Sequence, residues 1–292
     1  MALFGLKKSA SKYSHKCQTT IFLNGGLGNQ LFQFAFGVEI SRIRNSTIFL
    51  DTSFLDRDHK RNFALDIFGL PPNKTFEISG LKVMMVDKED ECNCEPYEIR
   101  ENDFFFSDFS SEIVKKGQLS VHGYWQSQKY FEESREVMRT LIASKLKANL
   151  NKKYGVIHIR RGDFMNDPHT RSFHGLLGVH YYMKACRLIP RDVKAVYLIS
   201  DEVIEANKIG IELSKAFPEL EFSLYEGASS EIDCLSLMAK SDFIVTANSS
   251  FSWWGSWIST ASFIVAPRNY FTQETSRVNN LIDLYPENWY LA

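Results

Sequence analysis

The sequence predicts an α/β protein built on parallel sheets, and two regions carry that prediction. Residues 20–50 follow the order strand, helix, strand. From residue 154 to residue 266, short apolar strands alternate regularly with segments of helical character. Strands joined by helices of these lengths pair in parallel, and the helices cover both faces of the sheet. We therefore expect a parallel α/β fold with helices on both sides of the strands.

The N-terminal β-α-β unit begins with an apolar run at residues 20–23, which predicts a buried strand. A glycine-rich turn at 24–28 follows it. Apolar residues at mostly helical spacing then predict a helix over 29–43. A second strand at 47–50 completes the unit.

The segment from 51 to 116 is irregular and contains Pro71 and Pro72, so it predicts loops and short pieces. A strand is expected at 119–125, followed by a helix at 127–147 that is rich in Glu, Lys, Leu and Ala. The end of this helix is the candidate domain boundary.

Three parts of the chain follow from that boundary: a polar leader at 1–18, an N-terminal α/β domain at 19–150 and a C-terminal α/β domain at 151–292. The predicted strands of the C-terminal domain lie at 156–159, 195–199, 222–224, 243–247 and 263–266. Its predicted helices lie near 180–189, 202–216, 231–240 and 252–260. Ligands of such sheets bind beyond the carboxyl ends of the strands, so a functional site is expected there.

Composition limits the possible partners. The chain of 292 residues has 34 Lys+Arg and 35 Asp+Glu, a net charge of −1, so no overall field attracts nucleic acid and any anion must meet a local cluster. The five cysteines form an odd, scattered set without a metal-ligand spacing, which indicates a reducing compartment. We find no apolar run typical of a signal peptide or a membrane span and expect a cytoplasmic protein.

The first candidate site follows the strand at 156–159. Period-2 alternation places His158 and Arg160 on one face of this strand and Arg161 on the other. Arginine offers a planar fork of donors for phosphate or carboxylate, and Asp163 could orient one guanidinium group by accepting its hydrogen bonds. A surface salt-bridge cluster explains the same residues equally well.

The second candidate site follows the strand at 243–247. Asn248, Ser249 and Ser250 are small polar residues placed to cap a following helix. Free backbone N–H groups at a helix N-terminus also bind anions, so capping and phosphate binding are compatible. Trp253 and Trp257 lie four residues apart, a spacing that favours core packing over a ligand platform.

The third candidate site is the glycine-rich turn, where glycines let the backbone approach a ligand closely. It does not match the dinucleotide fingerprint, because the third glycine would fall at Leu31. Asp56 and Asp58 form the DxD spacing that holds a metal in many sugar-nucleotide enzymes. No clear strand precedes this pair, and basic neighbours that include Arg61 favour a solvated charged loop.

Taken together, the motifs resemble those of the bacterial α-1,2-fucosyltransferase family over about residues 21 to 290. Their order is GGLGNQLFQFAFG at 25–37, GYWQSQKYF at 123–131, HIRRGDF at 158–164, HGLLGVHYYMKA at 174–185, SD at 200–201 and NSSFSWWGSW at 248–257. The resemblance implies a GT-B-like fold, in which two Rossmann-like domains face each other across a cleft. It also implies GDP-fucose as donor, bound by the C-terminal domain, with no metal and no cofactor.

The resemblance assigns roles to individual residues. Arg160 would bind the β-phosphate, Asn29 would lie near the reacting centre, and Asp163 would orient Arg160 or act as the base. The implied donor-binding residues are Gly26, Gly28, His158, Arg161, Ser200, Asp201, Asp233, Asn248, Ser249, Ser250 and Phe251. The implied acceptor-binding residues are Gln30, Tyr124 and Trp125. The sequence departs from the family's SDD motif, which ends in Trp and Cys, because Glu202 follows Asp201 here.

The implied reaction is transfer of fucose to O2 of a terminal β-galactose on a surface or lipid-linked oligosaccharide. It would take place at the cytoplasmic face of a membrane, which the four lysines among residues 1–16 could contact weakly. The alternatives are a fucosyltransferase of another linkage, a transferase with another donor, and a non-catalytic nucleotide- or carbohydrate-binding relative. The sequence predicts no oligomeric state.

Overall fold

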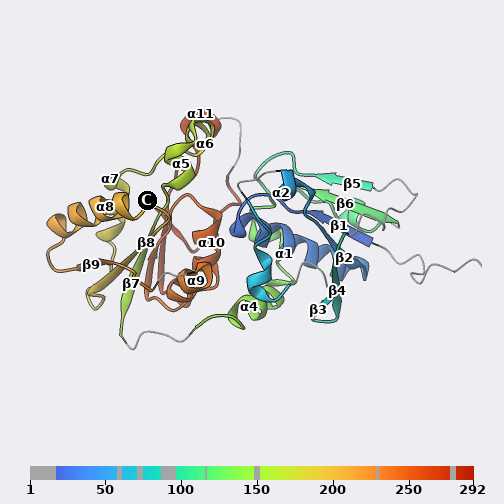
Figure 1. The fold of residues 1–292 in the computed structure, drawn as a ribbon, viewed down its shortest axis with the longest axis horizontal. Coiled ribbons are helices and arrows are strands. Elements are labelled where there is room, and N and C mark those ends of the chain that lie inside the picture. Colours follow the sequence, from blue (N-terminus) through green and yellow to red (C-terminus); the bar gives the residue numbers. More distant parts are fainter. Residues whose placement is uncertain are drawn as a thin grey trace, which may run out of the picture.

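Two six-stranded sheets, one from each half of the chain, form the framework of the molecule (Figure 1). A computed structural model describes residues 18–57, 61–70, 75–86, 97–115, 117–147, 152–227, 230–276 and 281–292. We call the half that contains the first sheet the N-terminal lobe and the half that contains the second sheet the C-terminal lobe. The predicted α/β fold with parallel sheets is confirmed.

The N-terminal lobe is built around the predicted β-α-β unit. Its strands are β1 (Gln18–Phe22), β2 (Thr47–Asp51), β3 (Phe76–Ile78), β4 (Leu81–Met85), β5 (Tyr97–Arg100) and β6 (Gln118–His122), and their order in the sheet is β3-β4-β2-β1-β6-β5. Helix α1 (Leu27–Arg44) connects β1 to β2, which pair in parallel with Ile21 opposite Leu50. The hairpin partner β3 is the one antiparallel strand among the described residues.

Three expectations for the N-terminal lobe were wrong in part. Segment 51–116 supplies β3, β4 and β5 to the sheet, besides the short helices α2 (Ser53–Arg57) and α3 (Ser110–Ile113). The predicted strand at 119–125 ends at His122, because Gly123 and Trp125 have positive φ angles. The predicted helix at 127–147 consists of a 3-10 turn, Gln128–Phe131, and a separate helix α4 (Arg135–Ala143).

The C-terminal lobe is a fully parallel sheet among the described strands. These are β7 (Tyr154–Ile159), β8 (Ala195–Ser200), β9 (Glu221–Leu224), β10 (Phe243–Val245), β11 (Phe263–Ala266) and β12 (Tyr290–Leu291), in the order β12-β11-β10-β7-β8-β9. Its helices are α5 (Gly162–Asn166), α6 (Pro168–His174), α7 (Val179–Cys186), α8 (Val203–Ala216), α9 (Glu231–Ala239), α10 (Ser250–Trp257) and α11 (Gln273–Ser276). The five strands and four helices predicted for this lobe are all present.

Helices α1 and α10 pack against each other where the lobes meet (Figure 1). Phe32 on α1 lies 4.5 Å from Trp253 and 5.0 Å from Trp254, measured between ring centroids. Trp253 and Trp257 are buried and stacked, which confirms the core role expected for them. One hydrophobic core therefore extends from one lobe into the other.

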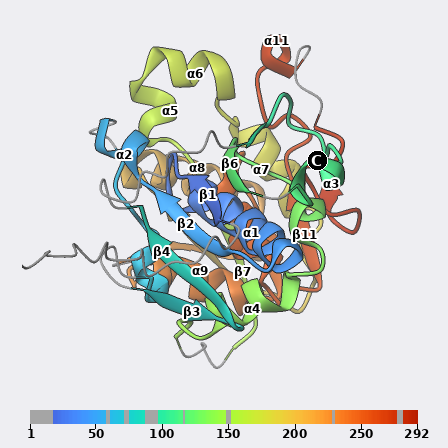
Figure 2. The same ribbon diagram turned by 90° about the vertical axis from the view of Figure 1, so that its right-hand side faces the viewer.

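Helices α5, α6 and α11 lie together at one end of the C-terminal lobe (Figure 1 and Figure 2). The backbone N–H of Thr272 donates to the carbonyl of Phe173 at 3.1 Å and fixes the segment before α11 to α6. None of the helices in the described part of the chain is long and apolar enough to span a membrane.

Candidate active site

A cavity of about 460 Å³ lies between the two lobes. It is situated beyond the carboxyl ends of β1 and β6 from one sheet and of β7 and β10 from the other. The N-terminal lobe contributes Gly25, Gly26, Leu27, Gly28, Asn29, Arg61, Phe104, Tyr124 and Gln126 to the wall. The C-terminal lobe contributes Arg160, Asp163, Phe164, His169, Thr170, Phe173, His174, Glu231, Asn248, Ser249, Ser250, Phe251, Tyr270 and Phe271. The structure thus brings the three sequence motifs to one cavity.

The glycine-rich turn places the N-terminus of α1 in the wall of this cavity. Gly25 has φ +75°, and a Cβ there would collide with the Asn29 side chain, so the turn requires glycine. Asn29 Oδ1 accepts a hydrogen bond from Gln126 Nε2 at 2.9 Å, which orients the amide. Gly26 is the N-cap of α1, and no side chain caps the helix there. Helix α1 therefore begins at the cavity wall without a capping side chain.

Gln30 does not line the cavity, and its predicted contact with the acceptor was wrong. Its side chain is fully buried. Gln30 Nε2 donates to the carbonyls of Gly25 at 2.9 Å and Asn62 at 2.8 Å, and Oε1 accepts from the N–H of Ala64 at 2.9 Å. A buried amide with all these partners positions the backbone, so Gln30 fixes the glycine turn to the segment around Asn62.

Of the two predicted aromatic acceptor residues, Tyr124 lines the cavity and Trp125 does not. Trp125 is 0% exposed and packs against Phe36 at 4.4 Å between ring centroids, so its predicted role was wrong. The carboxylate of Glu101 accepts hydrogen bonds from the N–H groups of Tyr124, at 2.6 Å, and Trp125, at 2.9 Å. Burial raises the pKa of Glu101 to about 7. These bonds hold the turn that directs the Trp125 ring into the core and the Tyr124 ring toward the cavity.

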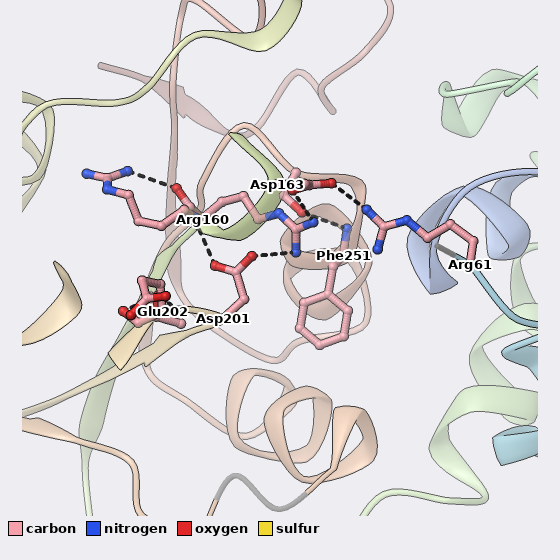
Figure 3. Close-up of polar contacts among 9 residues, drawn as sticks. Arg61, Arg160, Asp163, Asp201, Glu202 and Phe251 are labelled. Atoms are coloured by element: carbon pink, nitrogen blue, oxygen red, sulfur yellow. Dashed lines mark hydrogen bonds and ion pairs between the residues drawn. The ribbon is translucent and has the colours of Figure 1, made fainter. Parts of the chain in front are cut away.

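Arg160 occupies the carboxyl end of β7 and is held by two carboxylates (Figure 3). Its guanidinium group lies 2.6 Å from Asp163 Oδ1 and 2.9 Å from Asp201 Oδ2. A Cβ on Gly162 would lie 2.5 Å from Asp201 Oδ2, so glycine allows this close approach. The guanidinium carbon of Arg160 also lies 5.5 Å from the centroid of the Phe164 ring. Arg160 is therefore oriented before any ligand binds.

Two predicted donor-binding residues beside Arg160 serve the protein itself and do not line the cavity. Arg161 is buried and donates to the carbonyls of Arg160 at 2.8 Å and Leu177 at 2.7 Å. The hydroxyl of Ser200 bonds to the backbone of Glu202. Asp201 also lies outside the wall, but it acts on the site because it holds both Arg160 and the N–H of Arg161. Direct donor contacts by Arg161, Ser200 and Asp201 stay a prediction, and none of the three lines this cavity.

His158 and Asp233, also predicted to bind the donor, are buried and lie outside the cavity wall. His158 lies behind Phe251, with ring centroids 5.7 Å apart. Burial and the nearby Arg160 lower the pKa of His158 to about 3, so the imidazole is neutral at pH 7. Asp233 accepts from the hydroxyl of Ser230 at 2.7 Å and pairs with Lys147.

The N-terminus of α10 forms the opposite side of the cavity. Ser249 is the N-cap, and its side chain accepts from the N–H of Phe251 at 3.3 Å. Asn248 donates to the carbonyls of His174 at 3.0 Å and Tyr270 at 3.2 Å, which fixes two loops of the wall. Ser250 completes the polar edge. The N-terminus of α10 therefore lies at the cavity, and helix N-termini are places where proteins bind anions.

The sequence interpretation missed several residues of the wall. Arg61 was assigned to a solvated loop, yet it lines the cavity and pairs with Asp163 (Figure 3). His174 stacks on Phe164 at 4.5 Å, and burial lowers its pKa to about 4. Glu231 lines the cavity at the start of α9, and burial raises its pKa. Phe104, Phe173 and Phe271 form an aromatic cluster on the wall. The charge of Arg61, without apolar periodicity around it, gave no signal in the sequence. The aromatic cluster gave none either, because its members come from separate segments of the chain.

The DxD pair contributes nothing to the described wall. Asp56 is exposed on α2, and Asp58 lies outside the described residues. No group of three His, Cys, Asp or Glu side chains in the described ranges is placed to hold a metal ion.

The cavity combines two kinds of surface. Two guanidinium groups and two helix N-termini line it beside the carboxylates of Asp163 and Glu231, and guanidinium forks and helix N-termini are the groups that bind a diphosphate. Aromatic faces and amide side chains line the remaining wall, as is typical of sites that bind sugars. Two Rossmann-type lobes with such a cavity between them form a GT-B-like architecture.

Comparison with known proteins gives the family. The model of the family described as "Glycosyl transferase family 11" matches residues 2–291, and the chain belongs to this family. An α-1,2-colitosyltransferase of Escherichia coli is 29% identical over 295 residues, which cover 91% of this chain and 96% of that protein. The O-antigen biosynthesis glycosyltransferase WbnK of Escherichia coli is 27% identical, with 91% of this chain and 98% of that protein covered.

Among solved structures, the fucosyltransferase NodZ from Bradyrhizobium matches at a TM-score of 0.47 and 12% identity, covering 83% of this chain and 92% of that chain. The family that the sequence motifs resemble is thereby confirmed by the family match.

Proposed function

We propose that the protein transfers fucose from GDP-β-L-fucose to O2 of a terminal β-galactose, with inversion and without a metal ion. The acceptor would be a surface or lipid-linked oligosaccharide. The single observation that carries the proposal is the placement of Arg160. Its guanidinium group lines the cavity between the lobes, held by Asp163 and Asp201 and facing the N-terminus of α10.

The reaction breaks the bond between C1 of fucose and the β-phosphate oxygen. Negative charge gathers on the leaving diphosphate while the sugar becomes oxocarbenium-like, and stabilising the former is the main catalytic task. Arg160 meets this charge as a fork of donors that is already oriented. Backbone N–H groups at the first turn of α10 supply further donors without any reorganisation.

The acceptor hydroxyl approaches from the N-terminal lobe. Asn29, whose amide is oriented by Gln126, is placed to position this hydroxyl or the fucose ring. The proton of the hydroxyl passes to water once the bond to C1 has formed. Asp163 is a positioning residue in this scheme, because its two carboxylate oxygens accept from Arg160 and Arg61. A dissociative transition state requires little help from a base.

The acceptor sugar would lie against the aromatic part of the wall. Tyr124 and Phe104 come from the N-terminal lobe, and Phe271 meets Phe104 at 5.0 Å between ring centroids. Aromatic faces pack well on the apolar faces of sugar rings and leave their hydroxyl groups free to hydrogen-bond.

One observation favours GDP-colitose as a second candidate donor: the 29% identity to an α-1,2-colitosyltransferase. Colitose is fucose without the 3-hydroxyl group, so both donors carry the same guanosine diphosphate. The diphosphate site therefore supports either sugar, and the choice depends on contacts to the 3-position.

The test incubates the purified protein with GDP-fucose or GDP-colitose and a panel of β-galactosides, and follows released GDP and product mass. The proposal expects a product one fucose residue heavier than the acceptor, formed from GDP-fucose faster than from GDP-colitose. Faster transfer from GDP-colitose would favour the second donor. Tight GDP binding with neither transfer nor hydrolysis of either donor would indicate a binding protein.

A further inference from the structure

Arg61 reaches from the N-terminal lobe to the same carboxylate that holds Arg160. Asp163 Oδ1 accepts from Arg160 at 2.6 Å, and Asp163 Oδ2 accepts from Arg61 (Figure 3). Within the described part of the chain, Arg61 forms its ion pair with Asp163. The two guanidinium groups, from opposite lobes, are therefore separated by a single carboxylate group.

We propose that Arg61 is a second diphosphate-binding residue, which contacts the sugar-bearing phosphate together with Arg160 but from the opposite lobe. The inference rests on the proposed function, because it takes a nucleoside diphosphate sugar as the ligand. Carboxylate and phosphoryl groups both present anionic oxygens close together, and both accept hydrogen bonds from the guanidinium group of arginine. A phosphoryl group can therefore receive both arginines in the way that Asp163 does.

The place of Arg61 is built into the fold. Gln30, buried in α1, holds the carbonyl of Asn62 at 2.8 Å and the N–H of Ala64 at 2.9 Å. The backbone that follows Arg61 is thus fixed to the helix whose N-terminus lines the cavity. A Cβ on Gly26 would lie 3.8 Å from the guanidinium of Arg61, so this group lies over the N-cap of α1.

Exposure agrees with a ligand-binding role. The side chain of Arg61 is 34% exposed, and it lines the cavity. A guanidinium group has five N–H donors, and Asp163 accepts one of them from Arg61. Counting the described residues, Arg61 thus has donors left for the oxygens of a phosphoryl group placed between the lobes.

The proposal assigns Arg61 to the β-phosphate of GDP and not to the α-phosphate. Because Arg61 and Arg160 share one acceptor group in the free protein, we expect them to share the β-phosphate in the complex. Loss of Arg61 should then weaken binding of GDP but leave binding of GMP and guanosine unchanged. A residue that merely joins the lobes would affect all three ligands alike.

The experiment measures binding of GDP, GMP and guanosine by isothermal titration calorimetry. It compares the wild-type protein with Arg61→Ala, Arg61→Lys and, as a matched control, Arg57→Ala, since Arg57 is exposed on α2 and lies outside the cavity wall. We expect Arg61→Ala to weaken GDP binding about tenfold or more, Arg61→Lys to weaken it less, and Arg57→Ala to leave it unchanged. Guanosine affinity should stay within about twofold in all variants.

A double variant sharpens the test. If both arginines hold one phosphate, the fold-loss in GDP affinity of Arg61→Ala/Arg160→Ala should differ from the product of the single losses, as expected for coupled groups. Wild-type GDP affinity in Arg61→Ala, or equal losses for GDP and guanosine, would overturn the inference alone. Failure of the wild-type protein to bind GDP would overturn the proposed function and this inference together.

Discussion

The indole nitrogen of Trp254 donates a hydrogen bond to the carbonyl of Gly28 at 3.0 Å, across 226 positions of sequence. The bond joins the first turn of α1 to α10, and both helices contribute their N-termini to the cavity. A Cβ on Gly28 would collide with the backbone of Ser250. The distance between the two N-termini is thus set by the absence of a side chain at Gly28.

Gly28→Ala should separate these helices and destabilise the protein. Overpacking against backbone atoms costs typically about 1–3 kcal/mol, because neither helix can move without disturbing the shared core. Urea denaturation measures the change in the free energy of unfolding. Gly155→Ala is the control, since a Cβ there meets its neighbours at 3.6–3.7 Å, an ordinary contact. Equal stability of Gly28→Ala and the control would contradict the close approach.

Arg160→Ala should lower kcat about 10²- to 10³-fold, the usual cost of losing one preorganised donor to developing charge. Arg160→Lys should recover little of this loss, because an ammonium group lacks the fork that meets two oxygens. Initial rates with GDP-fucose test both variants, and circular dichroism checks that each is folded. Near wild-type turnover in either variant would remove Arg160 from the mechanism.

Gly162→Ala should reduce activity without touching the substrate. The added Cβ would lie 2.5 Å from Asp201 Oδ2, so Asp201 must shift and release its 2.9 Å contact with Arg160. We expect a lower kcat and a small change in melting temperature. Gly178→Ala is the matched control, because nothing lies within 4 Å of a Cβ at that position. The same kcat for both variants would show that Asp201 does not position Arg160.

His158 should make the protein labile to acid. Its folded pKa of about 3 lies below the ordinary value of 6.5, so between these values the unfolded chain binds a proton that the folded protein excludes. Stability therefore falls as pH drops from 6.5 toward 3, by up to about 1.4 kcal/mol per pH unit. His174, with a pKa of about 4, acts in the same direction.

His158→Leu removes one of these two titrations and keeps the buried apolar contact with Phe251. The unfolding free energy of this variant should therefore depend less steeply on pH between 6 and 4, roughly by the share of one histidine. Denaturation curves at several pH values measure the difference, and groups common to both proteins cancel. Parallel pH profiles for wild type and variant would show that His158 is not held neutral in the fold.

The C-terminal lobe was the part of the fold most open to prediction. Its central strands β7 and β10 are buried along their whole length, so each gives a continuous apolar run. The missed strands of the N-terminal sheet gave no comparable signal. In β5 only Ile99 is buried, and in β4 only Val83, so neither strand forms a continuous buried run. The sequence there resembled a loop.

The candidate site was predictable where residue type alone indicates chemistry. Arg160, Asn29 and the residues from Asn248 to Phe251 all line the cavity. Arg161 and Asp233 have the same chemistry but are buried, and residue type alone does not distinguish such a buried charge from a ligand contact. The place of Arg61 in the site could not be predicted from the sequence, because only the folded chain brings it to Asp163.

The most direct test of the central claim determines the product linkage by NMR after incubation with GDP-fucose and a β-galactoside, with and without EDTA. The account predicts an α-1,2-fucosyl galactoside, formed at the same rate in both conditions, because guanidinium groups and helix N-termini stabilise the leaving diphosphate. A product of another linkage, or turnover that EDTA abolishes and a divalent metal restores, would contradict it.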